Sequence, residues 1–140
     1  MAGNIILEVV TPDRMVVNEE AQIVVAPGTE GEFGVLIGHT PFLTSLKIGI
    51  LRYKDKEGVE RFVFVNNGFA EALPNKVTVL AESAERRRDI DIERAKRALE
   101  RAKRRLEEGV EKEEIDFHRA QAALQRAITR IKLAETRSHP

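Results

Sequence analysis

The 140-residue sequence contains no cysteine and no tryptophan, and only 5% of its residues are aromatic. Without cysteine there can be no disulfide, no thiolate chemistry and no metal site built on sulfur. The three histidines, His39, His118 and His139, lie far apart in the sequence. We therefore expect no metal site in this protein.

The chain has no excess charge of either sign, because 23 Lys and Arg residues balance 23 Asp and Glu residues. This balance argues against a nucleic-acid binder that relies on bulk positive charge. The two parts differ, however: residues 1–84 carry 7 basic and 11 acidic side chains, and residues 85–140 carry 16 and 12. The second part is the one that favours an anionic ligand or partner.

Long apolar runs are also missing, since no stretch approaches the ~20 residues needed to cross a bilayer. The opening residues, Met-Ala-Gly-Asn, lack the basic side chains that begin a secretory signal. We expect a cytosolic protein, or one that is attached to a membrane only through a partner, with no membrane insertion of its own.

Residues 1–84 have the composition of a β domain, with six of the seven aromatic residues and eight of the nine glycines. Alternation and turn residues predict strands over 5–11, 15–17, 22–26, 47–54, 60–65, 69–73 and 76–80. Asp55–Gly58 is a good hairpin loop, and Asn66-Asn67-Gly68 interrupts the chain before the next strand. In total we expect about nine short strands, packed as a sandwich or flattened barrel.

Residues 28–44 depart from the strand pattern, with four glycines and one proline. One interpretation is a pair of tight turns around a single strand. The other is an exposed loop, with Glu32 and His39 at its tip, placed to meet a partner. No serine or acidic residue stands at an obvious triad spacing from His39, so we assign it no catalytic role.

After Asp91 the apolar residues recur at helical spacing. One seam consists of Ile92, Ala95, Leu99, Ala102 and Leu106, and a second of Phe117, Ala120, Leu124, Ile128 and Ile131. The stretch Asp89–Ala95 holds the candidate N-cap of the first helix, Gly109 ends that helix, and Asp116 can cap the second. Two helices of ~16–20 residues with a short connection predict an antiparallel hairpin.

The seams contain many alanines, which bury little area, whereas a large apolar side chain contributes ~1.5–3 kcal/mol when buried. We therefore expect a hairpin that is only marginally stable alone and needs the β domain, a ligand or a partner to hold it. The plain alternative is a packed helical hairpin whose charges are simply solvated.

Arginines add a second feature to the helical part. Arg119, Arg126 and Arg130 lie at spacings of 7 and 4 residues, which stacks them along one helix face. Arg94 follows Asp91 by three residues on the first helix. Guanidinium groups beside a helix N-terminus suit a polyphosphate. An acidic surface on a partner protein is the other interpretation of this charge.

Three motifs together resemble a known family, the ε subunit of bacterial F-type ATP synthase, and the resemblance extends over the whole chain. Leu7–Asp13 looks like the opening strand of that family. Gly31–Thr44 is similar to its signature loop, although Ile37 stands where the family usually has proline. Asn67–Glu71, followed by Asn75–Ala81, matches its last strands.

The resemblance implies an α+β fold, with an antiparallel β-sandwich of about ten strands in residues 1–84 and an antiparallel two-helix hairpin in residues 85–140. It implies a non-catalytic subunit of the central stalk, on the cytoplasmic side of the cell membrane. The subunit would bind the γ subunit and sit on the c-subunit ring, with Glu32 and His39 facing that ring. It would couple proton-driven rotation to ATP synthesis.

The resemblance also implies regulation. In family members the helical pair folds down on the sandwich or extends along γ into the α/β head, and the extended form blocks ATP hydrolysis. Some members bind ATP in the folded form through Ile/Leu-Asp-x-x-Arg-Ala, which Ile90–Ala95 matches in full. ATP would be a regulatory ligand and not a substrate, with the Mg²⁺ requirement left open. The implied binding residues are Glu85, Ile90, Asp91, Arg94, Ala95, Arg119, Arg126 and Arg130.

Two alternatives stay open beside this hypothesis. The hairpin of a rotor subunit could be purely structural, with a vestigial nucleotide motif. More distantly, the chain could be a free-standing nucleotide-binding module with no connection to a rotor.

Overall fold

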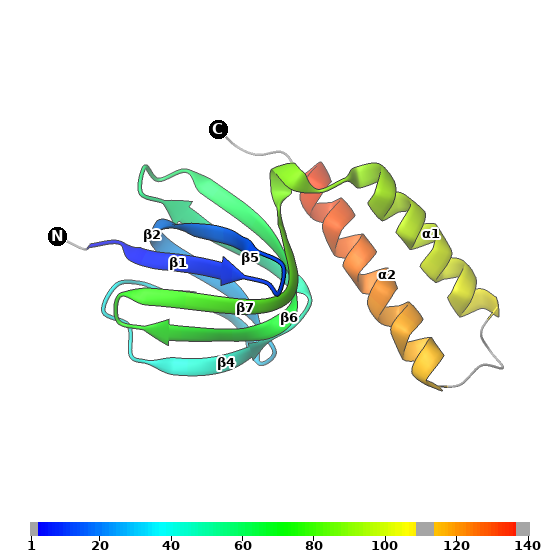
Figure 1. The fold of residues 1–140 in the computed structure, drawn as a ribbon, viewed down its shortest axis with the longest axis horizontal. Coiled ribbons are helices and arrows are strands. Elements are labelled where there is room, and N and C mark those ends of the chain that lie inside the picture. Colours follow the sequence, from blue (N-terminus) through cyan, green and yellow to red (C-terminus); the bar gives the residue numbers. More distant parts are fainter. Residues whose placement is uncertain (1–2, 109–113, 137–140) are drawn as a thin grey trace. The chain divides into compact units, whose positions relative to one another are not determined.

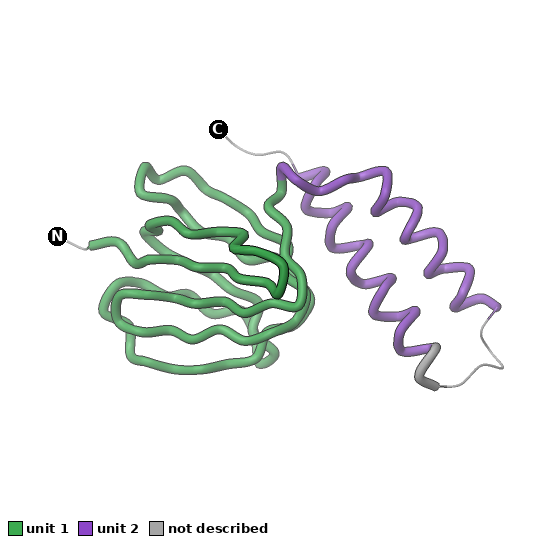
Figure 2. Tube along the Cα trace, in the orientation of Figure 1, with its two compact units in different colours: residues 1–87, 138–140 green, residues 88–137 purple. Residues whose placement is uncertain are grey.

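A computed structural model describes residues 3–108 and 114–136 of the chain. These residues form two compact units, one ending at Arg87 and the other beginning at Arg88 (Figure 2). The predicted domain boundary lies a few residues earlier, after residue 84. Within the described residues, neither helix is both long and apolar enough to cross a membrane.

The first unit is a β-sandwich. Its strands are β1 (Ile5–Val10), β2 (Met15–Gly28), β3 (Gly31–Val35), β4 (Phe42–Leu46), β5 (Gly49–Asp55), β6 (Glu60–Leu73) and β7 (Lys76–Arg86) (Figure 1). Strand pairing runs from β1 to β7, β6, β5, β2 and back to β1. On the remaining edges β4 pairs with β6, and β3 with β2.

The described residues form seven strands, and not the nine or ten expected, because β2 and β6 are each one long strand. β2 joins the predicted strands 15–17 and 22–26, and β6 joins 60–65 and 69–73. The Asn66-Asn67-Gly68 segment therefore continues a strand instead of breaking it. β6 changes partner there, from β5 up to Val65 to β4 from Gly68 onward. Each long strand serves both layers of the sandwich.

One strand pair departs from the predicted antiparallel arrangement. β1 and β7 run parallel, with Leu7 opposite Val77 and Val9 opposite Val79. β1 also pairs with β2 on its other edge, so the N-terminal strand has neighbours on both sides. Pairing the first strand with the last removes two sheet edges that would otherwise be exposed.

The core of the sandwich follows from alternation along the strands. On β1 and β7 the side chains of Ile5, Leu7, Val77 and Val79 are fully buried, while the residues between them face outward. Burial of each such side chain contributes about 1.5–3 kcal/mol. The hairpin loop predicted after β5 is also present, with Asp55 as its first residue.

The second unit is a helical hairpin of α1 (Ile92–Glu108) and α2 (Glu114–Glu135), preceded by a short 3₁₀ turn, η1 (Arg87–Asp89) (Figure 1). Lys96 near the start of α1 forms an ion pair of 3.8 Å with Glu135 at the end of α2, as antiparallel helices require. α2 begins at Glu114, so Asp116 lies in its first turn and not at the N-cap. The predicted helix terminator Gly109 lies outside the described residues.

The buried side chains of the two helices are mostly small, as the sequence predicts: Ala95, Ala102, Ala120, Ala127 and Thr129, together with the larger Leu133. The seam predicted for α2 was wrong in part, because Phe117 and Ile128 are exposed. Ile128 stands about 100° around the helix from Ala127, so both cannot face the same neighbour. Leu133 is buried as the alanines are, whereas Phe117 and Ile128 lie to the side.

Candidate functional site

The segment Ile90–Ala95, which matches the ATP motif, forms the beginning of α1. The Asp91 carboxylate oxygen Oδ1 accepts a hydrogen bond of 3.0 Å from the backbone amide of Arg94. The Asp91 carbonyl accepts another of 3.0 Å from the amide of Ala95. Asp91 is therefore the N-cap of α1, within the stretch predicted to hold it. Its negative charge also lies at the positive end of the helix dipole.

Burial divides the motif into two kinds of residue. The side chains of Ile90 and Ala95 are buried, whereas Asp91 and Arg94 are exposed. The apolar residues are thus shielded from solvent. The charged residues face outward, where a ligand can reach them.

The three arginines of α2 lie at different distances from this segment. Helices rise 1.5 Å per residue, and the Lys96–Glu135 ion pair places the end of α2 beside the start of α1. Measured along the axis from Glu135, Arg130 is about 8 Å away, Arg126 about 14 Å and Arg119 about 24 Å. Arg126 and Arg130 are partly buried, and Arg119 is exposed. The structure brings Arg130 and Arg126 nearer to the start of α1 than Arg119.

Glu85, the remaining residue of the predicted ATP set, belongs to the first unit. It lies on β7, opposite Phe64 of β6, and its side chain is partly buried. The other seven residues of the set all lie in the second unit.

Glu32 and His39 do not share a loop tip. Glu32 lies within β3 and forms a 3.2 Å ion pair with Arg52. His39 lies in the connection after β3, where its Nδ1 is 2.6 Å from the Thr40 carbonyl oxygen and its ring meets the Phe42 ring edge-on at 5.0 Å. The first interpretation is correct in part, because β3 is a strand between two turns, but a second strand, β4, begins at Phe42 within the same segment.

Sequence reasoning missed an exposed apolar row on the outer face of the sheet. Val10, Leu80 and Phe69 are direct neighbours across β1, β7 and β6. Leu80 is 55% exposed and Phe69 is 57% exposed, and Leu43 on β4 is 69% exposed. The sequence could have indicated this row, because Val10, Phe69 and Leu80 occupy outward positions of predicted strands, where polar residues are usual.

A groove of about 610 Å³ runs beside this apolar row. Its lining includes Val10, Pro12, Gly68, Phe69 and Leu80. Gly68 lets the backbones approach closely here, because a Cβ atom on it would lie 1.9 Å from the Leu80 carbonyl oxygen. Its φ of +123° also favours glycine. The groove and the row form one continuous apolar surface on the sandwich.

A β-sandwich with an exposed apolar face, followed by a helical hairpin rich in arginine, defines a small two-unit protein of the class that assembles with other chains. The chain belongs to the ATP synthase delta/epsilon chain family. The beta-sandwich domain of that family matches residues 4–87, and its long alpha-helix domain matches residues 88–135.

Individual relatives agree with the family models. The chain is 69% identical over 107 residues to the ATP synthase epsilon chain of Desulfatibacillum aliphaticivorans, covering 76% of each chain. It is 55% identical over 135 residues to that of Syntrophobacter fumaroxidans, covering 96% of this chain and 98% of the relative. The chain is therefore an epsilon-type subunit of an ATP synthase.

Solved structures show the same fold. A chain of the Euglena gracilis mitochondrial ATP synthase, solved as an assembly of OSCP, F1 and c-ring, is similar with a TM-score of 0.76 and 26% identity. The similarity covers 90% of this chain and 78% of that one. A chain of the Tetrahymena thermophila mitochondrial enzyme, at 11% identity and a TM-score of 0.59, shares the fold.

Proposed function

We propose that this chain is a non-catalytic rotor subunit on the central stalk of the ATP synthase, and that it helps to couple proton translocation to ATP synthesis. The observation that carries the proposal is the apolar row formed by the exposed Leu80 and Phe69 and the partly buried Val10. Contiguous apolar side chains on an outer sheet face are typical of a surface that another protein covers. The family membership supplies the assembly to which that protein belongs.

Two different parts of the sandwich surface would bind the two partners. The apolar row and its groove would bind the γ subunit. The segment from β3 to the following connection, which carries Glu32 and His39, would face the c-subunit ring. Through these two partners the chain would be held peripherally at the cytoplasmic face of the cell membrane.

Assembly with purified γ and c-ring tests the docking proposal. Replacing two row residues together, Leu80→Ser with Phe69→Ser, should leave the sandwich folded, because both side chains are already more than half exposed. The double variant should lose most of its co-purification with γ. The control is Val59→Ser, an exposed apolar residue in the loop between β5 and β6. Full retention of γ by the double variant would refute the docking face.

The second part of the proposal concerns regulation. The alanine interface between α1 and α2 contributes little free energy, so a folded and an extended form of the hairpin would lie close in energy. A ligand that binds only one form stabilises it by ~2.7 kcal/mol at a hundredfold excess over its Kd. ATP bound through Asp91, Arg94, Arg126 and Arg130 would hold the folded form. Without ATP, the extended hairpin would reach the α/β head and block hydrolysis.

The competing function is a rotor subunit whose hairpin is structural. One observation favours it: Asp91 already has a role as the N-cap of α1 and needs no ligand to explain its presence. The arginines would then be solvated or would meet acidic partner surfaces.

Calorimetric titration of the full chain with ATP and ADP, with and without Mg²⁺, separates these two functions. A sensor should bind ATP in preference to ADP. Arg126→Ala should weaken ATP binding by about tenfold or more, the loss expected for a hydrogen bond to a charged group. Arg97→Ala, which removes an exposed arginine of α1 outside the proposed site, is the control. No binding at millimolar ATP would leave the structural role.

A further inference from the structure

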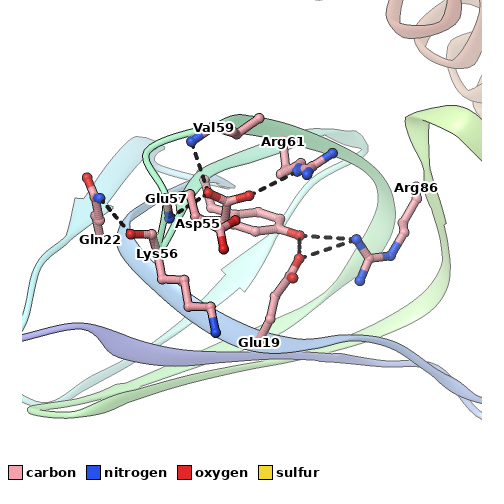
Figure 3. Close-up of polar contacts among 9 residues, drawn as sticks. Glu19, Gln22, Asp55, Lys56, Glu57, Val59, Arg61 and Arg86 are labelled. Carbon is pink, nitrogen blue, oxygen red and sulfur yellow. Dashed lines mark hydrogen bonds and ion pairs between the residues drawn. The ribbon is translucent and has the colours of Figure 1, made fainter. Parts of the chain in front are cut away.

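Arg86 is the last residue of β7, and its side chain reaches across to two other strands (Figure 3). The guanidinium Nε donates to the Val16 carbonyl on β2 at 3.1 Å. Its Nη1 lies 3.3 Å from Glu19 Oε1 on β2 and 3.2 Å from the Tyr53 hydroxyl on β5. One side chain thus ties the end of β7 to both β2 and β5.

Tyr53 completes the network. Its ring is buried in the core, and its hydroxyl donates a hydrogen bond to Glu19 Oε1. Burial, followed by this hydrogen bond to Glu19, raises the pKa of Tyr53 above its usual range, so the hydroxyl keeps its proton and remains a donor. Glu19, Tyr53 and Arg86 are therefore bonded pairwise to one another. In a partly buried site such mutual bonds reinforce each other.

The network lies at the end of β7, where that strand has few backbone partners. β1 pairs with β7 only over Lys76–Leu80, so within the described residues the rest of β7 has a backbone ladder with β6 alone. The β6–β7 pairing ends with Val63 opposite Arg86. A strand end with one neighbour frays readily unless side chains hold it. The contacts of Arg86 with Val16, Glu19 and Tyr53 lie at this end, and the next residue, Arg87, stacks over the Phe62 ring of β6 at 5.6 Å.

We propose that Glu19, Tyr53 and Arg86 form a clamp that fixes the end of β7 and thereby sets the length of chain free to move between the two units. With the clamp closed, residues 87–91 separate β7 from α1. Without it, the last residues of β7 join the connection, each adding up to ~3.3 Å of reach. This inference goes beyond the proposed function, because it requires neither ATP nor a partner subunit.

Hydrogen exchange of the full chain tests the clamp. In Arg86→Met, which keeps the length of the side chain but loses its donors, amides of residues 84–87 should exchange roughly tenfold faster or more. Tyr53→Phe leaves the ring in the core and should raise the same rates by a smaller factor. Asp55→Asn, two residues beyond Tyr53 on β5, is the near-neighbour control and should affect the β5–β6 loop instead. Unchanged rates at 84–87 in both clamp variants would overturn the proposal, as would a uniform rise across the sandwich.

Distance measurements test the consequence for the connection. Because the sequence has no cysteine, spin labels attach only at introduced positions such as Glu60→Cys and Glu100→Cys. The label-to-label distance distribution should be wider in Arg86→Met and Tyr53→Phe than in the unmodified chain or in Asp55→Asn. Equal widths in all four proteins would show that the clamp does not control the connection. Neither readout involves ATP or γ, so failure here is distinct from failure of the proposed function.

Discussion

The carboxylate of Asp91 accepts a hydrogen bond of 3.0 Å from the backbone amide of Arg94, so the Asp91 side chain meets the Arg94 backbone at the helix N-terminus. Replacing the cap by alanine, Asp91→Ala, should destabilise the hairpin by about 0.5–2 kcal/mol. Asp91→Asn keeps a capping oxygen and should cost far less. Hydrogen exchange in the first turn of α1 measures both effects.

The same pair of variants distinguishes the role of Asp91 as a helix cap from its role as an ATP ligand. Asn is isosteric with Asp and lacks only the charge. If Asp91→Asn retains the stability of α1 but loses ATP binding, the carboxylate contacts the ligand directly. If Asp91→Asn keeps both and Asp91→Ala loses both, the residue acts on ATP only by holding the helix start.

Distance along α2 predicts unequal roles for its arginines. Arg126 lies about 14 Å along the axis from Glu135 and Arg119 about 24 Å, so a triphosphate near the start of α1 would lie closer to Arg126. Arg126→Ala should therefore weaken ATP binding more than Arg119→Ala. Titration of the two variants under one condition checks this order, and the reverse order would move the nucleotide toward the other end of the hairpin.

Gly68 is predicted to be irreplaceable for two separable reasons. Gly68→Ala must adopt a left-handed φ, which costs about 1–3 kcal/mol, and must also relieve the contact of its Cβ with the Leu80 carbonyl. Gly31 has a similar φ of +128°, but a Cβ there meets nothing within 4 Å. Gly31→Ala is therefore the matched control, and the excess loss of unfolding free energy in Gly68→Ala reports the close approach of β6 and β7. Equal losses in a denaturant titration would contradict this account.

We expect the free energy of unfolding to depend on pH through Asp55. Hydrogen bonds from the Val59 amide above all, and then from Arg61 and Glu57, outweigh the effect of burial and lower the pKa of Asp55 from its usual value (Figure 3). The folded state therefore favours the carboxylate, and its contribution is present above the unfolded pKa of about 3.9. It is lost as the pH falls through the lower, folded pKa.

Denaturant unfolding of the unmodified chain and of Asp55→Asn, from pH 6 downward, measures this contribution. The difference in unfolding free energy should be constant near neutral pH and should shrink below about pH 4. A difference that stays the same down to acid unfolding would mean that the charge of Asp55 does not stabilise the loop.

The local features of the fold were predictable from neighbouring residues. The cap at Asp91, the hairpin loop after Asp55 and the alanine seam of α1 each depend on contacts within a few positions along the chain. The phase of α2 was not predictable in the same way. Phe117 and Ile128 fit the helical spacing as well as the alanines do, and only packing against α1 decides which set is buried.

The predicted number of strands was wrong for a related reason. Asn66-Asn67-Gly68 has the composition of a turn, yet in the structure β6 passes through it while changing partner from β5 to β4. Hydrogen bonds to strands distant in the sequence compensate there for a backbone conformation that would end an isolated strand. The exposed row was missed because outward positions identify a surface only once their cross-strand neighbours are known.

By itself the sequence determined the division into a β part and a helical part, the opposite charges of the two, and the motif at Ile90–Ala95. Periodicity, composition and charge are properties of residues near one another along the chain, so they can be read without coordinates. Only the tertiary structure decided that Val10, Leu80 and Phe69 form one surface, and that Glu19, Tyr53 and Arg86 meet at the end of β7. These groups join residues dozens of positions apart, and it is strand register and side-chain packing that bring them together.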